Sequence, residues 1–335
     1  MIDPKLSYSN SLTSSKNLLA FSAGVDSSAL FFLLIENQIP FDIALVNYAL
    51  REESQAEEAY ALSLAEEYNV AVYITKAPQW NNNFEANARA FRYKFFHSLI
   101  DEHHYTNLLT AHQLNDQLEW FLMRLSKGAG VSELIGLEPS TLRYTPSGNP
   151  FYLTRPLLAS TKEELLSYLK SHNHHYFIDK SNSQKKYERN RFRANWSDGL
   201  IAEYAEGIAR SFEYLREEKH LLAEGIETTV RIKELRVLHL ASSRLRSKGA
   251  DQALKELGYL LSSKQREEIA HKKSIVIGGK WAVVYQNSRL YIAPFTTTPM
   301  PKMFKELCRV SAMPIKIRSY CYENEIRPRD VMIIE

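Results

Sequence analysis

The sequence predicts an α/β fold: a Rossmann-like parallel sheet with helices on both faces, followed by a helical segment and a small α+β C-terminal domain. From about residue 17 to 112, strand-like and helix-like stretches alternate along the chain. The strand-like stretches are apolar almost throughout, which is typical of parallel strands covered on both faces. The pattern changes after residue 130. We place a domain boundary near residue 200, which gives a first domain over residues 1–200 and a helical linker with a C-terminal region over residues 201–335.

The individual elements follow in order from their segments. NLLAF (17–21) predicts the first strand, and SSALFFLLIENQ (27–38) predicts a helix that Asp26 and Ser27 are suited to cap. Further strands are expected over residues 41–50, 70–75 and 106–112. Helices are expected over residues 53–69, 83–104, 114–130 and 198–225. We also expect one more strand and helix between residues 131 and 172, one helix over residues 250–271, and hairpin strands over residues 274–294.

Composition places the chain among soluble globular proteins. It has 335 residues, of which 44% are hydrophobic and 24% are charged. Its two cysteines, Cys308 and Cys321, are too few for a zinc site, an iron–sulfur cluster or a disulfide framework, and their scarcity fits a reducing compartment. The N-terminal residues have no apolar signal core, and no apolar run is long enough to cross a bilayer. We therefore expect a cytoplasmic protein without a membrane partner.

The net charge is mildly positive, at +3 with a pI near 8.6. Basic residues gather in KKYERNRFR (185–193) and in RLRSK (244–248). Such clusters contact nucleic-acid phosphates in some proteins and are solvated helix faces in others. The sequence leaves both interpretations open.

The loop within FSAGVDSSAL (21–30), between the first strand and the first helix, suggests a phosphate site. A loop that enters a helix at the carboxyl end of a parallel strand attracts anions, because free backbone N–H groups and the helix dipole point at it. Gly24 permits a tight bend and the close approach of a phosphate. Asp26 repels phosphate unless a cation intervenes, which suggests Mg²⁺ between Asp26 and a polyphosphate. The expected nucleotide-binding residues of this loop are Ser22, Ala23, Gly24, Val25, Asp26 and Ser27.

Two familiar phosphate-binding patterns are absent from this loop. It has neither the lysine of a Walker-type loop nor the Rossmann glycine pattern. On the loop alone, the alternative interpretation is a capped helix after a buried strand, with Asp26 as an ordinary first-turn acid.

Residues 22–27, SAGVDS, resemble the SGGxDS loop of N-type ATP pyrophosphatases, the PP-loop superfamily, which cleave ATP between the α and β phosphates. Ala23 stands where that family has glycine, and alanine is tolerable there if its φ is negative. Several enzymes share the loop, but further segments resemble, in the same order, the tRNA(Ile)-lysidine synthetase family over about residues 17–215. These segments are NYALREES (47–54), NFEANARAFRY (83–93), AHQLNDQLEW (111–120), GAGVSELIGL (128–137), RPLL (155–158), DKSN (179–182) and RNRFR (189–193).

The resemblance implies an adenine nucleotide alpha hydrolase-like fold for the first domain, and a two-step reaction. ATP adenylates the C2 carbonyl oxygen of the wobble cytidine in a tRNA(Ile) with a CAU anticodon, and pyrophosphate leaves. The amine of free L-lysine then attacks C2 and AMP leaves. The product, lysidine, changes codon specificity from AUG to AUA and amino-acid identity from Met to Ile. ATP and Mg²⁺ are the implied cofactors, and the C-terminal region is implied to bind tRNA. The oligomeric state stays open, with a homodimer as one option.

Matches to the family motifs assign roles to individual residues. Asp116 and Glu119 share one helical face and are implied to hold the lysine ammonium groups or to orient the attacking amine. Arg92 is implied to neutralise charge on the phosphates or on the leaving AMP, and Arg189 to reach the substrate or tRNA phosphates. Without the resemblance, a capping acid or a surface ion pair explains these residues about as well. With Asp26 as the metal-linked residue, these five form the expected catalytic set.

Two more residues are expected to contact the nucleotide, and four depart from the family pattern. Arg51 and His112 each follow a strand at the edge where ligands bind in such sheets. The departures are Tyr48 for histidine, Gln113 for a frequent second histidine, Asn115 for the first acid of a paired Asp, and Trp120 for threonine. The change at Asn115 makes Asp116 the carboxylate of interest.

Two other functions stay open at this point. A PP-loop tRNA thiolase shares the ATP loop, but the thiolases we compare use cysteines near the site, and both cysteines here are far downstream. A non-catalytic tRNA-binding protein with a degenerate ATP fold would explain Ala23, Gln113 and Asn115. Such a protein would not consume ATP when given tRNA and lysine.

Overall fold

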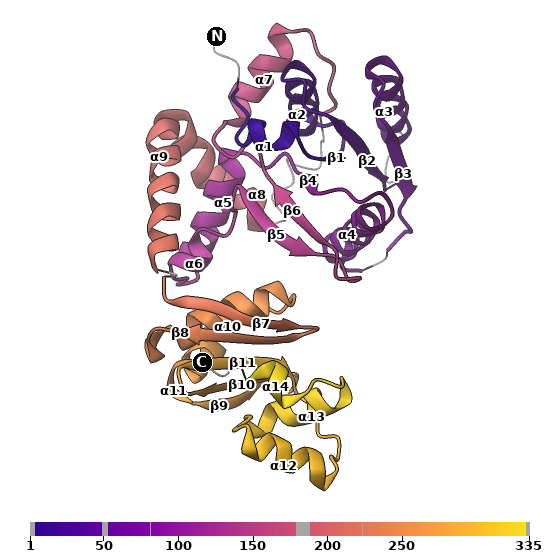
Figure 1. The fold of residues 1–335 in the computed structure, drawn as a ribbon. Helices are drawn as coiled ribbons and strands as arrows, with labels where there is room; N and C mark the ends of the chain where they lie inside the picture. Colours follow the sequence, from indigo (N-terminus) through magenta and orange to yellow (C-terminus); the bar gives the residue numbers. More distant parts are fainter. Residues whose placement is uncertain (1–3, 49–52, 81, 179–187, 223, 333–335) are drawn as a thin grey trace. The chain divides into compact units, whose positions relative to one another are not determined.

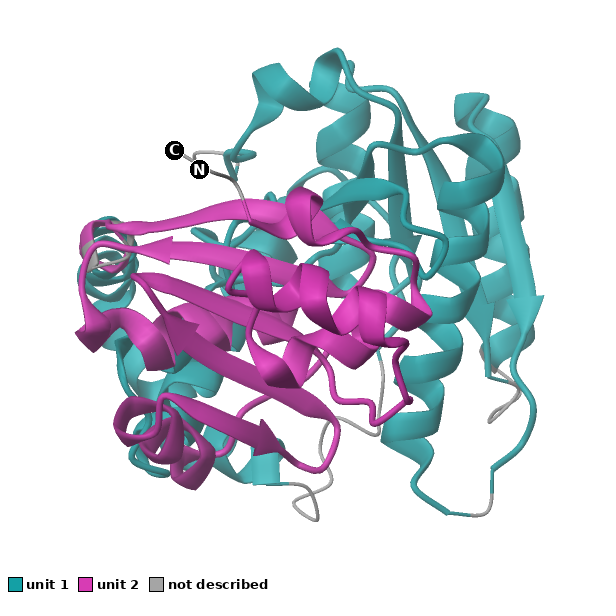
Figure 2. Ribbon diagram, turned by 60° about the horizontal axis from the view of Figure 1, so that its bottom comes forward, with its two compact units in different colours: residues 1–217 teal, residues 218–335 magenta. Residues whose placement is uncertain are grey.

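The computed structural model describes residues 4–332, except residues 49–52, 81, 179–187 and 223. The chain divides into two compact units, Met1–Glu217 and Glu218–Glu335, and each is described by itself (Figure 2). The division falls inside one continuous helix, α9 (Asp198–Leu222). The boundary expected near residue 200 therefore stays a prediction.

The first unit is built on a mixed six-stranded sheet with the strand order β3-β2-β1-β4-β6-β5 (Figure 1). Five strands run parallel, as the sequence predicts, and β5 pairs antiparallel with β6. The hairpin strand β5 was not expected, because three of its five residues are only partly buried and the other two are exposed. The strands are β1 (Asn17–Phe21), β2 (Phe41–Asn47), β3 (Val72–Lys76), β4 (Asn107–Leu109), β5 (Ser140–Tyr144) and β6 (Pro150–Thr154).

Helices cover both faces of this sheet because successive strand residues point to opposite sides. Leu19 of β1 packs with α2, α3 and α7, whereas its neighbour Leu18 packs with α4. Figure 1 shows α2 and α7 on one side of the sheet and α4 on the other. The helices of this unit are α1 (Ser9–Thr13), α2 (Val25–Glu36), α3 (Glu53–Tyr68), α4 (Phe84–His103), α5 (Leu114–Leu125), α6 (Val131–Leu134), α7 (Lys162–Ser171), α8 (Glu188–Phe192) and the π-helical turn η2 (Arg193–Ser197).

A separate apolar contact holds α9 against α5. Leu114 and Leu118 of α5 pack with Ile201 and Phe212 of α9. The contact is tight enough to place the ring of Phe121 5.6 Å from that of Phe212. Because η2 and α8 lead directly into α9, this packing fixes the side of α5 on which their arginines lie.

The second unit is a five-stranded antiparallel sheet with the order β7-β8-β11-β10-β9 and helices on both faces. The hairpin strands β9 to β11 were expected, but β7, β8 and the last three helices were not. The helix expected over residues 250–271 is two helices, because Gly258 has a φ of +78° and ends the first one. The elements are β7 (Ile226–Ile232), β8 (Leu235–Leu240), η3 (Ser243–Leu245), α10 (Arg246–Glu256), α11 (Ser263–His271), β9 (Ser274–Ile277), β10 (Trp281–Gln286), β11 (Arg289–Pro294), α12 (Lys302–Val310), α13 (Ile315–Glu323) and α14 (Pro328–Val331).

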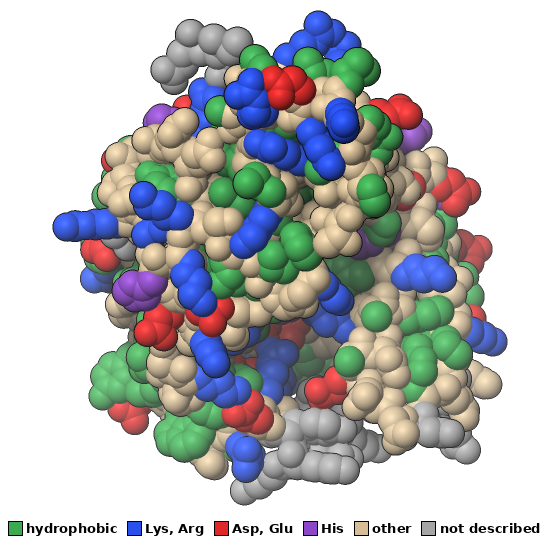
Figure 3. Space-filling view, turned by 90° about the horizontal axis from the view of Figure 1, so that it is seen from below, with side chains coloured by type: hydrophobic (Ala, Val, Ile, Leu, Met, Phe, Trp, Pro, Cys, Tyr) green, Lys and Arg blue, Asp and Glu red, His purple; other side chains and the backbone are tan. Residues whose placement is uncertain are grey.

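Membrane-spanning helices are not found within the described ranges, where no helix is both long and apolar enough to cross a bilayer. Basic side chains are spread over the face seen from below in Figure 3, with acidic and hydrophobic ones between them.

Candidate active site

The carboxyl ends of three neighbouring parallel strands carry the polar residues that the sequence singled out. Residues 22–24 follow β1, residues 110–113 follow β4, and Arg155 follows β6. Since these strands are adjacent in the order β1-β4-β6, their following residues line one edge of the sheet.

The bend after β1 is made by Ala23 and not by Gly24. Ala23 has a φ of +56°, in the left-handed region that favours glycine, whereas Gly24 has an ordinary φ of −76°. The tight bend expected at Gly24 is therefore at Ala23, and the negative φ under which alanine would be tolerable at position 23 is not observed. The Ala23 methyl is fully buried, and its carbonyl accepts a hydrogen bond of 2.8 Å from the backbone N–H of Phe177. A segment far along the chain thus holds the bend in place.

The first turn of α2 is not capped by any side chain. Gly24 is the N-cap residue and makes no side-chain cap hydrogen bond, so Asp26 and Ser27 do not cap the helix as expected. Instead the Ser27 hydroxyl donates to the Gly24 carbonyl at 3.2 Å and accepts from the backbone N–H of Ser22 at 3.2 Å. The first intrahelical bond is from the Ser28 N–H to Gly24, so the N–H groups of residues 25–27 have no partner within the helix. This is the geometry of an anion site.

Asp26 lies in the first turn of α2 and is only partly exposed. The pKa of its carboxyl is raised to about 6, mainly by burial and also by the nearby Asp116 carboxylate, while Lys162, Arg193 and Arg189 oppose the shift. One of its oxygens, Oδ1, is buried and has no hydrogen-bond partner. A buried carboxylate oxygen without a partner fits a metal ligand beside a polyphosphate, because Mg²⁺ is usually bound by one or two carboxylates together with phosphates and water. No group of three or more His, Cys, Asp or Glu side chains in the described part of the chain could hold a metal ion by itself.

The start of α5 explains two of the departures from the family pattern. The Gln113 side chain accepts from the Asn115 N–H at 2.6 Å, and Asp116 Oδ2 accepts from the Gln113 N–H at 3.0 Å, which together form a capping box. Asn115 Oδ1 accepts from the backbone N–H of Lys162, at the first residue of α7, at 3.2 Å. Gln113 and Asn115 therefore have structural partners, and Asp116 is left as the carboxylate that faces Asp26.

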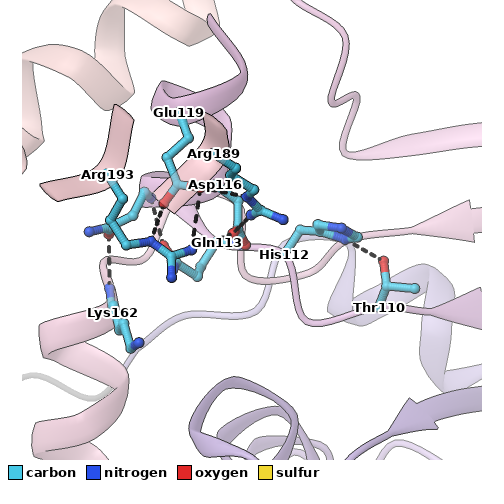
Figure 4. A network of polar contacts seen from close by, with 9 residues as sticks. Thr110, His112, Gln113, Asp116, Glu119, Lys162, Arg189 and Arg193 are labelled. Atoms are coloured by element: carbon cyan, nitrogen blue, oxygen red, sulfur yellow. Dashed lines mark hydrogen bonds and ion pairs between the residues drawn. The ribbon is translucent and has the colours of Figure 1, made fainter. Parts of the chain in front are cut away.

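Two buried carboxylates pair with two guanidinium groups beside this helix, the partly buried Arg193 and the exposed Arg189 (Figure 4). Glu119 is fully buried, and its oxygens accept from Arg189 Nε at 2.6 Å and from Arg193 Nε at 2.5 Å. Arg189 also donates through Nη2 to Asp116 Oδ1. The structure thus pairs Arg189 with Asp116 and Glu119, and Arg193 with Glu119, which the sequence did not predict. Removing either arginine would take a partner from a buried carboxylate.

His112 lies in the segment that follows β4, which ends at Leu109 and is shorter than the strand expected over residues 106–112. Its Nδ1 is 3.0 Å from the Thr110 hydroxyl. The pKa of His112 is lowered to about 4, mainly by burial and also by the cationic Arg155, Arg189 and Arg89, while the charge of Asp116 opposes the shift. The imidazole is therefore neutral at pH 7 and is suited to hydrogen bonding, not to neutralising phosphate charge.

Arg92 is held by the residue that replaces the family's histidine. Arg92 Nε donates to the Tyr48 hydroxyl at 3.0 Å, and its guanidinium lies 6.0 Å from the centre of the Tyr48 ring. The Tyr48 hydroxyl donates in turn to the carbonyl of Ala88 at 3.4 Å. Tyr48 thus links the end of β2 to α4, a role that the sequence did not indicate. Arg51 lies outside the described residues, as does the segment 179–182.

Trp120 is accommodated by a glycine. Its indole Nε1 donates to the Glu133 carbonyl at 2.9 Å, and a Cβ atom at Gly136 would lie 2.3 Å from that same nitrogen. The bulky residue at position 120 therefore requires glycine at position 136, within the glycine-rich segment that follows α5.

A parallel sheet with an uncapped phosphate loop after its first strand defines the PP-loop class of nucleotide-binding domains. The family model described as a PP-loop domain matches residues 4–199. A solved structure, the U34-tRNA thiolase NcsA from Methanococcus maripaludis, shares the fold, with a TM-score of 0.50 and 20% identity over 64% of this chain and 75% of that one.

Relatives that match nearly the whole chain show which family within this class the protein resembles. A tRNA(Ile)-lysidine synthase of Campylobacter jejuni (strain RM1221) is 41% identical over 94% of this chain and 95% of its own. The tRNA(Ile)-lysidine synthase of Wolinella succinogenes is 41% identical over 93% of this chain and 94% of its own. That of Helicobacter hepaticus is 39% identical over 92% of this chain and 82% of its own. The chain belongs to the tRNA(Ile)-lysidine synthase family.

Proposed function

We propose that this protein ligates free L-lysine to C2 of the wobble cytidine of a CAU-anticodon tRNA(Ile), with ATP and Mg²⁺, through an adenylated cytidine. The observation that carries the proposal is the juxtaposition of the uncapped α2 N-terminus and the orphaned Asp26 oxygen with the Asp116–Glu119–Arg189–Arg193 network. The identity of about 40% with lysidine synthases over most of the chain supports the same reaction.

The first step requires a triphosphate to be held and its charge to be neutralised. The N–H groups of residues 25–27 and the hydroxyls of Ser22 and Ser27 would bind the phosphate oxygens. Asp26 would hold the magnesium ion, which draws charge from the pyrophosphate leaving group. Arg92, oriented by Tyr48, would stabilise the charge that develops when the cytidine C2 oxygen attacks the α phosphorus and the bond to pyrophosphate breaks.

The second step requires a cationic amine to approach and to lose a proton. The lysine amine attacks C2, AMP leaves from the C2 oxygen, and the amine proton passes to a base. Asp116 is the better placed carboxylate for this proton, because Glu119 is fully buried between two arginines. We therefore assign Glu119 to holding Arg189 and Arg193 in place, which changes the role first expected for it. His112, neutral at pH 7, would donate or accept a hydrogen bond at the nucleotide.

The thiolase alternative is disfavoured because the described residues contain no reactive thiol. Cys308 and Cys321 are both fully buried in the apolar core of the second unit. Burial raises the pKa of Cys321 to about 12 and raises that of Cys308 as well, which disfavours the thiolate that such chemistry needs. The non-catalytic alternative is weakened because Gln113 and Asn115 have structural partners that leave Asp26 and Asp116 in place.

Incubation with ATP, Mg²⁺, radiolabelled lysine and total tRNA, followed by nucleoside analysis, tests the proposal. We expect label in one modified cytidine, with one pyrophosphate and one AMP released per lysine incorporated. Asp26→Ala should abolish incorporation, whereas Glu66→Gln, an exposed acid on α3, should leave it unchanged. Binding of tRNA without ATP consumption would reject the enzyme in favour of a binding protein, and a thiolated nucleoside formed when a sulfur donor replaces lysine would favour the thiolase.

A further inference from the structure

Arg155, which follows β6 at the edge of the sheet that carries the active site, has a buried guanidinium group with an unused donor. Its exposed fraction is 6%. Nη1 donates to the Glu138 carbonyl at 2.6 Å, whereas Nε is buried and has no hydrogen-bond partner. A buried donor without a partner is costly, so the position calls for a ligand that accepts hydrogen bonds. An arginine edge that includes Nε is the one that grips a carboxylate with two parallel bonds.

Two further arginines are close enough to Arg155 for their charges to act on it. Arg143 of β5 pairs with Phe151 of β6, the strand that Arg155 follows. Phe151 packs against α4, where the guanidinium of Arg89 lies 4.8 Å from the centre of the Tyr93 ring. Within the described ranges, Arg89, Arg143 and Arg155 make no ion pair within 4.0 Å. The pKa of Arg155 is lowered to about 10, mainly by burial and also by the charges of Arg143 and Arg89, while Tyr93 and Glu138 oppose the shift. An anion bound here would relieve this repulsion.

The place of this cluster relative to the network in Figure 4 limits what the anion can be. Strands β4 and β6 are neighbours, with Leu109 opposite Thr154, so His112 and Arg155 follow adjacent strands at one edge of the sheet. The charges of Arg155 and Asp116 both act on His112. At one end a ligand beside the neutral His112 would meet Arg155, which has no carboxylate partner among the described residues, and at the other end it would meet Asp116 and Glu119, which Arg189 and Arg193 already pair. A free amino acid with a cationic side chain has a carboxylate for Arg155 and an ammonium group for the carboxylate oxygens. A phosphodiester of an RNA backbone is bulkier and fits the exposed Arg89 and Arg143 better than the buried Arg155.

We propose that Arg155, assisted by Arg89, binds the α-carboxylate of the lysine substrate, so that the amine is directed toward Asp116 and C2 of the cytidine. The inference rests on the proposed function and adds to it the group that recognises a free amino acid. It explains why the site would select lysine over a simple diamine, which lacks the carboxylate.

The test compares lysine, lysinamide and 1,5-diaminopentane as amines in the full tRNA reaction, with the wild type, Arg155→Lys and Arg155→Met. In the wild type, kcat/KM for lysine should exceed that for the two carboxylate-free amines by about tenfold to a hundredfold, as is typical of a hydrogen bond to a charged group. In both variants this preference should collapse, mainly through the KM for lysine, with the KM for ATP unchanged. Arg210→Lys, an exposed arginine on α9, is the matched control and should keep the wild-type preference.

Each outcome decides between the possibilities. An equal preference for lysine in the wild type and the Arg155 variants would overturn the inference and leave the proposed function standing. A raised KM for tRNA with a smaller salt dependence, and an unchanged KM for lysine, would identify a phosphate site instead. If Arg155→Met does not fold, Arg155→Lys and the wild-type comparison of amines still decide, since a wild type without any preference for the carboxylate contradicts the inference. Lack of product from the wild type with every amine would instead reject the proposed function.

Discussion

Replacing Asp26 by asparagine is expected to stabilise the nucleotide-free protein while abolishing ATP turnover. The raised pKa of Asp26, about 6 against an ordinary 3.8, means that the folded state disfavours the ionised carboxylate. At about 1.36 kcal/mol per pKa unit this corresponds to roughly 3 kcal/mol above pH 6. Because the side chain is not fully buried, solvent screens part of this energy, and we expect a measured gain in the free energy of unfolding of about 1–2 kcal/mol.

The pH dependence gives the sign of this effect. Because the folded state binds the proton more tightly than the unfolded state, the wild type loses stability as the pH rises from 3.8 to about 6. The advantage of Asp26→Asn should therefore be complete above pH 6 and should disappear toward pH 4. Urea unfolding of both proteins between pH 4 and pH 8, with Glu66→Gln as control, measures it. A variant that is less stable than the wild type at pH 8, or a difference that does not change with pH, would refute the reasoning.

Three further substitutions test the local geometry. Gly136→Ala should lower the free energy of unfolding by about 1–3 kcal/mol, because its Cβ would meet the indole of Trp120. This cost should vanish when Trp120→Thr is added. If denaturant melts show that the effects of the two substitutions simply add, the contact is contradicted. Tyr48→Phe removes the hydroxyl that orients Arg92. It should lower kcat in the lysine-incorporation assay about tenfold and leave the melting temperature unchanged. Full activity of this variant would show that the contact with Arg92 does not matter for the reaction. Ala23→Gly should change the free energy of unfolding by less than about 1 kcal/mol. Glycine relieves the strain of the left-handed φ, and this gain offsets the lost burial of the methyl group and the larger entropy of the unfolded chain. A loss of about 2 kcal/mol or more in calorimetry would argue against strain at Ala23.

The sheet of the first unit could be predicted because its strands β1, β2 and β4 are mostly buried and therefore apolar almost throughout. The same signal fails at β5, whose residues are partly or fully exposed at the sheet edge. It also fails in the second unit, where the interruption at Gly258 depends on one backbone angle and not on the apolar pattern that continues across it. The strand β8 was also missed although five of its six residues are buried, so a local apolar pattern does not find every buried strand.

The candidate site could be predicted as a set of residues but not as a set of partners. The motifs indicated Asp116, Glu119 and Arg189, yet the pairing of Glu119 with Arg193 depends on how α9 packs against α5. The left-handed conformation of Ala23 was missed because a motif comparison shows a substitution without its φ.

The partners of Arg155 and Tyr48 could not be read from local sequence either. Each contact joins segments that are distant in the chain or that belong to different elements. Chemistry-bearing residue types are visible in a sequence, whereas their neighbours are fixed only by the tertiary fold.

A structure determined with Mg²⁺ and α,β-methylene ATP, which cannot be cleaved between the α and β phosphates, tests the central claim most directly. We predict the triphosphate on the backbone N–H groups at the start of α2, with the metal ion on the Asp26 oxygen that now has no partner. Nucleotide bound elsewhere, with the turn between β1 and α2 free of phosphate, would contradict the account.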